Sequence, residues 1–305
     1  MASQLVLPSS LQEASRHRVA TRADYWSLTK PDVNLLILIT TFAGFCLALP
    51  SPIEHFPRLL LINTLLGTLL VASGTGTLNQ YLERNFDAQM RRTLRRPVAS
   101  CRISASSALW FGIALSSLGC IFLYVEASVL ASLLALATLL SYLFMYTPLK
   151  RKTPLCTLVG ALPGAMPPLI GWAGAAGRLN LEAWSLYALL FLWQFPHFMA
   201  IAWMYREDYA RAGYLVLPRG EAKDRVMGLQ SVLPSVVLVA ASLIPLFIAH
   251  STFPYWSANV LLASGLLFYA CRLALQKSNG SAKRLLTASI IYLPLLFCVI
   301  LLSRF

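Results

Sequence analysis

Long apolar runs constrain the fold of this chain more than any other feature. Nine windows reach about 20 residues, the length at which an α-helix crosses the hydrocarbon core of a membrane. They lie at 33–50, 57–78, 104–124, 128–147, 154–176, 183–204, 229–250, 255–276 and 285–303. The strands of a membrane barrel are much shorter, about ten residues each, and lipid cannot satisfy free backbone groups. The sequence therefore predicts an all-α, polytopic membrane helix bundle with nine transmembrane helices.

The composition excludes a water-soluble domain. Hydrophobic residues make up 57% of the chain and charged residues 12%, and the mean hydropathy is +0.65. We expect a cytoplasmic tail at 1–30 followed by a single transmembrane domain at 31–305. Two acid-bearing segments each follow an apolar window, four windows apart, which divides that domain into motif-bearing halves of about 31–150 and 151–305.

The basic residues predict the orientation of the helices. All but three of the 25 Lys and Arg residues fall in the N-terminal tail or in and around the even-numbered connections, and the exceptions are Arg58, Arg178 and Arg304. Lys and Arg are retained on the cytoplasmic side of inserted segments. We therefore expect the N-terminus and both acidic segments in the cytoplasm and the C-terminus on the opposite side. The net charge of +13 then reflects topology and not nucleic-acid binding, and leaves anionic lipid headgroups and an anionic substrate as partners.

The first thirty residues indicate the kind of membrane. They contain no apolar core, so we expect no cleavable secretory signal ahead of the first helix. Glu13 and Asp24 are atypical of a mitochondrial transit peptide. This favours a bacterial inner (plasma) membrane over the mitochondrial inner membrane.

The first acidic segment places three oxygen-bearing side chains on one helix face. Asn79, Glu83 and Asp87 are four residues apart, and each such step advances only about 40° around a helix. Hard cations such as Mg²⁺ bind one or two carboxylates and leave other positions for water and substrate phosphate. The spacing therefore favours a magnesium-diphosphate site over a solvated charged loop that makes ordinary salt bridges.

Basic residues accompany this stripe in two places. Arg92 and Arg96 follow it, and guanidinium groups bind phosphate oxygens bidentately. Lys150 and Arg151 close the fourth window, where they either bind diphosphate or anchor the helix to lipid headgroups. Tyr146 lies one turn earlier, where an aromatic ring could face a developing carbocation.

The second acidic segment, YREDYARAG at 205–213, supplies Asp208 as an opposing metal ligand and Arg206 as a further cation. The alternative is a salt bridge at a helix end between Asp208 and Arg206 or Arg211. The near absence of other charges in the preceding window favours a functional role.

A polar cluster, WQFPHF at 193–198, lies inside the sixth window. His197 there either binds a neighbouring helix beside Pro196 or ligates haem iron, since imidazole is a common axial ligand. Trp193 and Gln194 would complete a mixed aromatic and polar surface for a flat ring. The preceding Gly- and Pro-rich stretch at 160–177 predicts a broken helix or close helix packing.

These segments together resemble the UbiA-type intramembrane prenyltransferases, and in particular their haem-farnesylating branch. The resemblance covers nearly the whole chain. LTKPDVNLL precedes the first window, Tyr146, Lys150 and Arg151 match a Tyr-Pro-x-x-Lys-Arg element, and GAMPP, WQFPHF and EDYARAG are typical of the haem branch. The first acidic signature is matched by Asn79, Glu83, Asp87, Met90, Arg92, Thr93, Arg96 and Pro97. Glu83 stands where aspartate is common, and Ala212 stands where the second motif often has another aspartate.

The resemblance implies transfer of a farnesyl group from farnesyl diphosphate to a vinyl group of haem b, which gives haem o for haem-copper terminal oxidases. It implies Mg²⁺ as the cofactor, haem b as a substrate, and a haem A synthase or an oxidase assembly factor as a candidate protein partner. The implied metal ligands are Asn79, Glu83, Asp87 and Asp208, and the implied diphosphate ligands are Arg92, Arg96, Lys150, Arg151 and Arg206.

Two other functions fit parts of the sequence. A related prenyltransferase that acts on an aromatic quinone precursor or a chlorophyll-type acceptor would keep the diphosphate site but would not need WQFPHF and EDYARAG. A small-molecule transporter would explain nine helices with breaks. Transporter sites lie near the bilayer midplane, however, whereas the acidic residues here lie at window ends.

Overall fold

The structure, a computed structural model, describes residues 20–50, 55–218, 220–242 and 253–302, with the side chains of 253–256 left out. Within these ranges, nine helical segments are long and apolar enough to cross a membrane. They are α3 (Pro31–Ala48), α4 (Arg58–Asp87), α5 (Ala105–Glu126), α6 with η1 and α7 (Val129–Leu149), α8 with α9 (Cys156–Ala176), α10 (Leu181–Met204), α12 (Ala222–Ala241), α14 (Phe253–Gln276) and α15 (Asn279–Leu302). The predicted all-α membrane bundle is confirmed.

Three helices extend six residues or more beyond the apolar windows that predict them. Helix α4 continues through the acidic stripe to Asp87, α12 begins at Ala222, before its window at 229–250, and α15 begins at Asn279, before its window at 285–303. In all three, the extension is polar and still helical, because hydropathy reports membrane contact and not helix ends. The end of the seventh window, 243–250, lies outside the described residues.

Part of the predicted N-terminal tail is helical. Thr21 caps the N-terminus of helix α2 (Arg22–Leu28). Its hydroxyl accepts a hydrogen bond from Asp24 N–H, and the Asp24 carboxylate accepts one from Thr21 N–H, which together form a capping box. Asp24 also pairs with Arg102 at 2.6 Å, which attaches α2 to the loop that precedes α5. Residues 1–19 of the tail lie outside the described residues.

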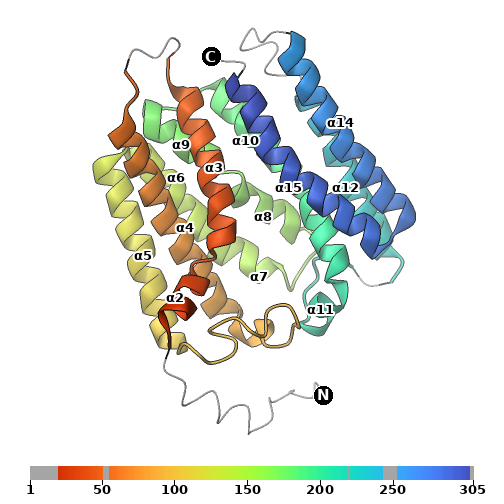
Figure 1. Cartoon of the computed structure of the whole chain (residues 1–305). Helices are drawn as coiled ribbons and strands as arrows, with labels where there is room; N and C mark the ends of the chain where they lie inside the picture. The colour runs from red at the N-terminus through yellow and green to blue at the C-terminus, as the bar shows by residue number, and fades with distance from the viewer. Residues whose placement is uncertain (1–19, 51–54, 219, 243–252, 303–305) are drawn as a thin grey trace.

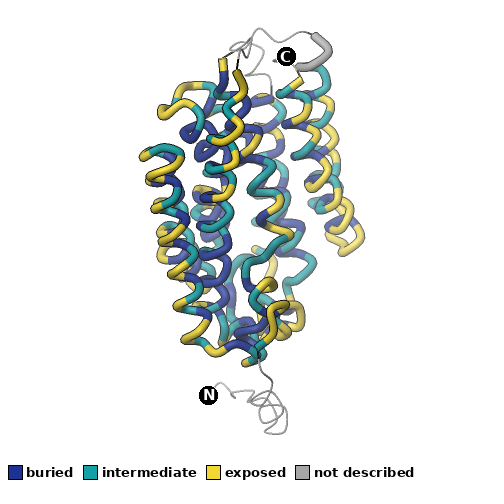
Figure 2. Tube along the Cα trace, turned by 60° about the vertical axis from the view of Figure 1, so that its left-hand side comes forward, coloured by how far each residue is buried: buried dark blue, intermediate teal, exposed yellow. Residues whose placement is uncertain are grey.

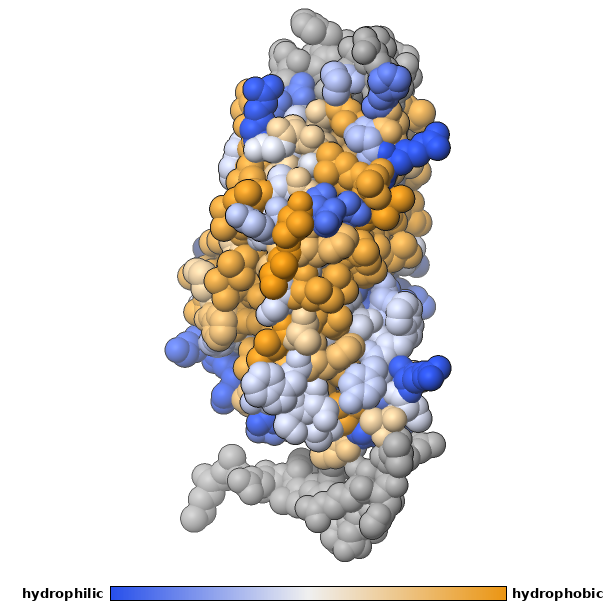
Figure 3. Space-filling view, turned by 90° about the vertical axis from the view of Figure 1, so that its left-hand side faces the viewer, coloured by the Kyte–Doolittle hydropathy of each residue, from blue (hydrophilic) through white to orange (hydrophobic). Residues whose placement is uncertain are grey.

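Short helices and connections gather at one end of the bundle. Figure 1 shows α2, α7 and α11 (Arg206–Arg211) at this end, with the connection that follows α4, whereas α15 ends at the other. Buried residues face the inside of the bundle in Figure 2. Apolar side chains dominate the middle of the face in Figure 3, and most hydrophilic ones lie toward its ends. This is the surface of a multi-pass membrane protein.

Two membrane segments depart from a regular α-helix. The Gly- and Pro-rich stretch is broken between α8 (Cys156–Gly164) and α9 (Pro167–Ala176), which is one of the two alternatives that the sequence leaves open. Before it, α6 (Val129–Leu140) passes through the π-helical segment η1 (Ser141–Tyr146) into α7 (Thr147–Leu149). Pro148 lacks an N–H and its ring would crowd an earlier carbonyl, which accounts for the wider turn. Both irregular segments lie beside the candidate site described below.

Glycines bring α3 and α9 into direct backbone contact. A Cβ placed on Gly171 would overlap the Thr41 carbonyl oxygen, and one on Gly44 would overlap the Pro168 carbonyl oxygen. Small residues permit this close approach, which supplies van der Waals contact in a lipid environment that offers little hydrophobic drive between helices.

Substitution of Gly171 by alanine tests this contact. We expect Gly171→Ala to lower the free energy of unfolding by about 1–3 kcal/mol, because the new methyl group forces α9 away from α3. Thermal unfolding in detergent measures the effect. The matched control is Gly265→Ala on α14, where a Cβ meets nothing within 4 Å. Equal melting temperatures for the two variants would contradict the packing argument.

Candidate active site

The stripe of oxygen-bearing side chains lies at the last two turns of α4 and faces inward. Asn79, Glu83 and Asp87 are 2%, 4% and 1% exposed. Asn79 Nδ2 donates to Glu83 Oε2 at 2.9 Å, so neighbours in the stripe touch as the spacing predicts. Buried carboxylates require partners of opposite charge.

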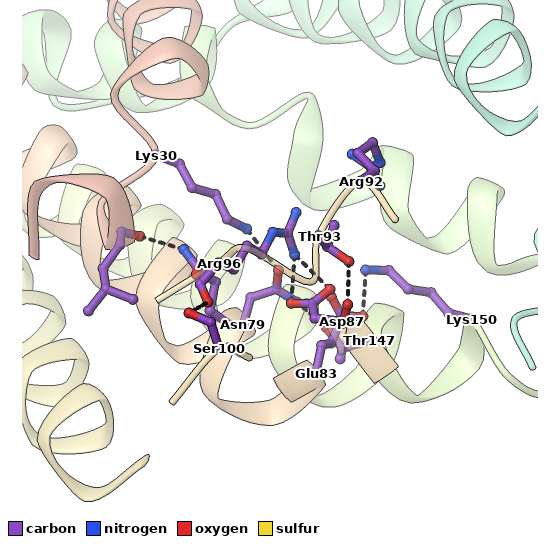
Figure 4. Close-up of polar contacts among 12 residues, drawn as sticks. Lys30, Asn79, Glu83, Asp87, Arg92, Thr93, Arg96, Ser100, Thr147 and Lys150 are labelled. Carbon is purple, nitrogen blue, oxygen red and sulfur yellow. Dashed lines mark hydrogen bonds and ion pairs between the residues drawn. The ribbon is translucent and has the colours of Figure 1, made fainter. Parts of the chain in front are cut away.

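Each member of the stripe is bound by a basic side chain from a different segment (Figure 4). Lys30 Nζ donates to Asn79 Oδ1 at 2.9 Å, and Lys150 Nζ lies 2.8 Å from Glu83 Oε1. The Arg96 guanidinium contacts both Asp87 oxygens, at 2.9 and 2.8 Å. Three cations from three parts of the chain thus converge on one helix face.

Glu83 lies at the centre of this network. Besides Asn79 and Lys150, it accepts a hydrogen bond from Tyr214 OH at 3.0 Å. Burial and the Glu83 charge both raise the pKa of the Tyr214 phenol, so it stays protonated as a donor. Burial alone would lower the pKa of Lys150, but the Glu83 carboxylate raises it well above its ordinary value. The Glu83–Lys150 pair is therefore ionised at neutral pH.

Lys30 is a site residue that sequence reasoning missed. By sequence alone it is one of several basic residues of the N-terminal tail, although it lies in LTKPDVNLL. Its φ is 53°, a left-handed backbone conformation directly before Pro31. From this turn the side chain reaches Asn79 on α4. Burial, and then the Arg96 charge, lower its pKa to about 7. The signal in the sequence was a lysine directly before a helix-starting proline, next to the membrane.

Tyr214 and Thr147 were missed as well. Tyr214 follows Gly213, whose φ is 72°, and Leu215 N donates to the Lys150 carbonyl oxygen at 2.7 Å. This backbone bond brings the segment after α11 beside the Lys150 turn. Thr147 Oγ1 lies 3.5 Å from Asn79 Nδ2. These contacts depend on tertiary structure, and the local sequence carries no signal for Tyr214.

An open cavity of about 550 Å³ lies beside Glu83, between α4 and the η1–α7 turn. Its walls combine Glu83 and Tyr214 with the apolar side chains Leu82, Leu143 and Phe144. Arg151 also lines the cavity, and its guanidinium carbon lies 4.4 Å from the centroid of the Phe86 ring. The volume is within the range of sites that bind small organic molecules.

Tyr146 is held against Lys150 and α8. The Lys150 ammonium lies 4.5 Å from the centroid of the Tyr146 ring. The other contact is with α8, where a Cβ on Gly160 would overlap the ring. Lys150 thus links the Tyr146 ring to Glu83 of the acidic stripe.

The structure places Asp208 against the connection that follows α4. Its Oδ2 accepts from the Arg92 backbone N–H at 3.2 Å, and its Oδ1 lies 3.3 Å from Arg211. Arg92 in turn lies over the Tyr205 ring at 4.8 Å. The contacts of Asp208 thus join α11 to this connection, and none of them is with Asn79, Glu83 or Asp87.

The contacts of Arg206 are with α10 and α15 and not with the acidic stripe. Its guanidinium donates to the Trp203 carbonyl at 2.7 Å and to Asn279 Oδ1 at 2.6 Å. It therefore joins the end of α10 to the start of α15.

The polar cluster of α10 lies deeper in the bundle. His197 and Trp193 stack with ring centroids 4.8 Å apart, and both bind Ser289 of α15. Gln194 Nε2 donates to the Ala161 carbonyl at 3.3 Å, across to α8. A Cβ on Gly164 would overlap the Gln194 amide. The three side chains predicted to bind haem thus share one neighbourhood.

The donors at the end of α4 fit a hard divalent cation. Within the described residues, no group of three or more His, Cys, Asp and Glu side chains could hold a metal unaided. Two carboxylates and the Asn79 amide supply hard oxygen ligands, and Mg²⁺ completes its shell with water and substrate phosphate. Lys30, Lys150 and Arg96 occupy these oxygens here, so binding of a cation would require them to exchange partners.

Comparisons with known proteins decide the family. The UbiA prenyltransferase family matches residues 37–296. The chain belongs to this family. It is 45% identical to a protoheme IX farnesyltransferase of Solibacter usitatus, over 92% of this chain and 98% of the relative. A protoheme IX farnesyltransferase of Koribacter versatilis is 38% identical over 92% of this chain and 93% of the relative.

Solved structures share the UbiA fold. A UbiA homolog from Aeropyrum pernix superposes with a TM-score of 0.65 at 16% identity, over 88% of this chain and 96% of the homolog. A homolog from Archaeoglobus fulgidus bound to GPP and Mg²⁺ has a TM-score of 0.60 at 13% identity, over 91% and 99%. Another structure of the Archaeoglobus fulgidus homolog holds DMAPP and Mg²⁺.

Removal of Lys150 tests the central ion pair. We expect Lys150→Met to lower the free energy of unfolding by about 3–5 kcal/mol, because Glu83 is left buried without its cation. Addition of Glu83→Gln should restore most of this loss, whereas Lys283→Met, an exposed site on α15, should have no effect. Chemical denaturation in detergent measures the free energy of unfolding of the unmodified protein and the three variants. A double variant no more stable than Lys150→Met would contradict the pairing.

Proposed function

We propose that this UbiA-family prenyltransferase transfers a farnesyl group from farnesyl diphosphate to a vinyl group of haem b and so forms haem o. The observation that carries the proposal is the buried stripe of Asn79, Glu83 and Asp87 encircled by basic side chains, in a chain 45% identical to a protoheme IX farnesyltransferase. The stripe supplies metal ligands and the surrounding cations supply phosphate ligands.

The first step breaks the allylic C–O bond of farnesyl diphosphate. Pyrophosphate takes the electron pair, and a farnesyl cation remains. Lys150 and Lys30, which lie over the stripe, stabilise the negative charge that grows on the leaving oxygen. Mg²⁺ bound to Asn79, Glu83 and Asp87 would supply further neutralisation of the diphosphate. Asp208 and the nearby Arg92 complete the proposed ligand set from the α11 side.

The second step forms the carbon–carbon bond. The terminal carbon of the haem vinyl group donates its π electrons to the farnesyl cation, and a cation forms on the carbon next to the porphyrin. Water adds to that carbon and loses a proton, which gives the hydroxyethylfarnesyl group. The Tyr146 ring, held beside Lys150, would stabilise the farnesyl cation. The apolar side chains Leu82, Leu143 and Phe144 of the cavity would shield this cation from water until the first bond has formed.

The location of the site follows from the charge distribution. We place the protein in a bacterial plasma membrane, with the end of the bundle that carries α2, α7 and α11 in the cytoplasm. Most Lys and Arg residues belong to the N-terminal tail and the even-numbered connections, and such residues are retained on the cytoplasmic side. Farnesyl diphosphate then presents its charged group to the cytoplasmic surface and its isoprenoid chain to apolar space. A haem A synthase or an oxidase assembly factor would receive the product.

A reconstituted reaction tests the proposal. The purified protein in detergent should convert haem b to haem o with farnesyl diphosphate and Mg²⁺, as followed by mass spectrometry. EDTA should abolish the product and excess Mg²⁺ should restore it, because the carboxylates need the metal to hold diphosphate. Release of pyrophosphate with a quinone precursor, but not with haem b, would overturn the proposed acceptor.

Substitution of Asp87 tests the stripe itself. We expect Asp87→Asn to lower the rate of haem o formation by about 100-fold or more, because the neutral amide removes a metal-binding charge. The control is Asp224→Asn, which removes a carboxylate from a partly exposed surface pair with Lys277. Full magnesium-dependent transfer by Asp87→Asn would contradict the assigned role.

A further inference from the structure

Helix α15 holds the His197 imidazole in one tautomer. His197 Nδ1 lies 2.8 Å from Ser289 Oγ. The Ser289 hydroxyl donates to the Leu286 carbonyl oxygen at 2.7 Å. A hydroxyl carries one hydrogen, so Ser289 Oγ accepts from His197 Nδ1–H. In the neutral ring, Nε2 then carries the lone pair.

Aromatic contacts fix the orientation of the same ring. Trp193 stacks on the imidazole with ring planes 24° apart, and its Nε1–H donates to the Ser289 carbonyl oxygen at 2.8 Å. Phe198 meets the imidazole edge-on, with centroids 5.7 Å apart. Ser289 thus binds two stacked rings of α10, His197 through its hydroxyl and Trp193 through its backbone carbonyl.

His197 Nε2 has no hydrogen-bond partner among the described residues, whereas Nδ1 is fully engaged. The side chain is not completely buried, so this nitrogen is accessible. His197 lies seven residues before the end of α10, which corresponds to about 10 Å along the helix. A polar lone pair at that depth in a membrane bundle marks a functional group.

We infer that His197 Nε2 is the axial ligand of the haem iron, and that Ser289 positions it. This inference rests on the proposed function, because haem b is the acceptor there. Histidine ligands of metals donate their second ring N–H to a fixed acceptor, which sets the tautomer and the orientation of the ring. The hydrogen bond from His197 Nδ1 to Ser289 Oγ is such an arrangement.

The short helix α8 relates this ligand to the diphosphate site. Its Gly160 packs against the Tyr146 ring beside Lys150, and its Gly164 packs against Gln194, one turn before His197 on α10. The two glycines are one turn apart, about 6 Å along α8. Helix α8 therefore packs against both the part of α10 that carries His197 and the Tyr146 ring beside the diphosphate site.

Spectra of bound haem test the inference. The full-length protein in detergent is titrated with haem b, and the absorption and electron paramagnetic resonance spectra are recorded. We expect imidazole-ligated iron in the unmodified protein and loss of this signature in His197→Ala. Added imidazole should restore the signature in His197→Ala. His55→Ala, which removes an exposed histidine between α3 and α4, should retain it.

The role of Ser289 has a separate readout. We expect Ser289→Ala to weaken haem b binding about 10–100-fold, because the ligand loses its fixed orientation, while Ser289→Thr retains most of the affinity. Metal-free protoporphyrin IX serves as the matched probe, since it has the same ring without iron. Its binding should change little in His197→Ala and Ser289→Ala.

Two results would overturn the inference. One is an unchanged iron spectrum in His197→Ala, and the other is equal loss of haem b and protoporphyrin IX, which would indicate a structural role for the histidine. Either can occur while the unmodified protein still forms haem o, so the inference can fail while the proposed function holds. Failure to form haem o in the presence of imidazole-ligated haem b would instead count against the proposed function alone.

Discussion

The pairing of buried acidic residues with basic ones organises the functional end of this bundle. Glu83 and Asp87 lie inside a membrane helix array, where an uncompensated carboxylate would destabilise the fold strongly. Lys150, in the turn after α7, pairs with Glu83, and Arg96, in the connection after α4, pairs with Asp87. Lys30, from the segment before α3, binds Asn79 beside them. Formation of these contacts therefore requires three separate segments to converge on α4, and the same convergence assembles the candidate active site.

This arrangement has a chemical consequence. The cations that stabilise the stripe in the free protein are the same groups that would bind diphosphate, and the carboxylates they release would bind the metal. Substrate and metal together thus replace one set of charge pairs by another. The buried network remains neutralised in both states, which avoids the cost of an isolated charge in a medium of low polarity.

The sequence predicts the fold well and the site in part. Apolar windows locate the nine membrane helices found in the described part of the chain, because lipid forces backbone groups into helices, but polar extensions such as the end of α4 escape a hydropathy criterion. The periodicity of a single helix suffices to place Asn79, Glu83 and Asp87 together. Contacts across the bundle are not encoded locally, so Lys30 and Tyr214 were missed, and Arg206 lies against Asn279. The opposing position of Asp208 stays a prediction.

A structure of the protein with a farnesyl diphosphate analogue tests the central claim most directly. A farnesyl thiodiphosphate that resists ionisation would be bound together with Mg²⁺ in lipid nanodiscs. The account predicts that the diphosphate lies at the end of α4, with Lys30 and Lys150 turned from Asn79 and Glu83 to its oxygens. A diphosphate bound elsewhere, with the Glu83–Lys150 and Asp87–Arg96 pairs intact, would contradict it.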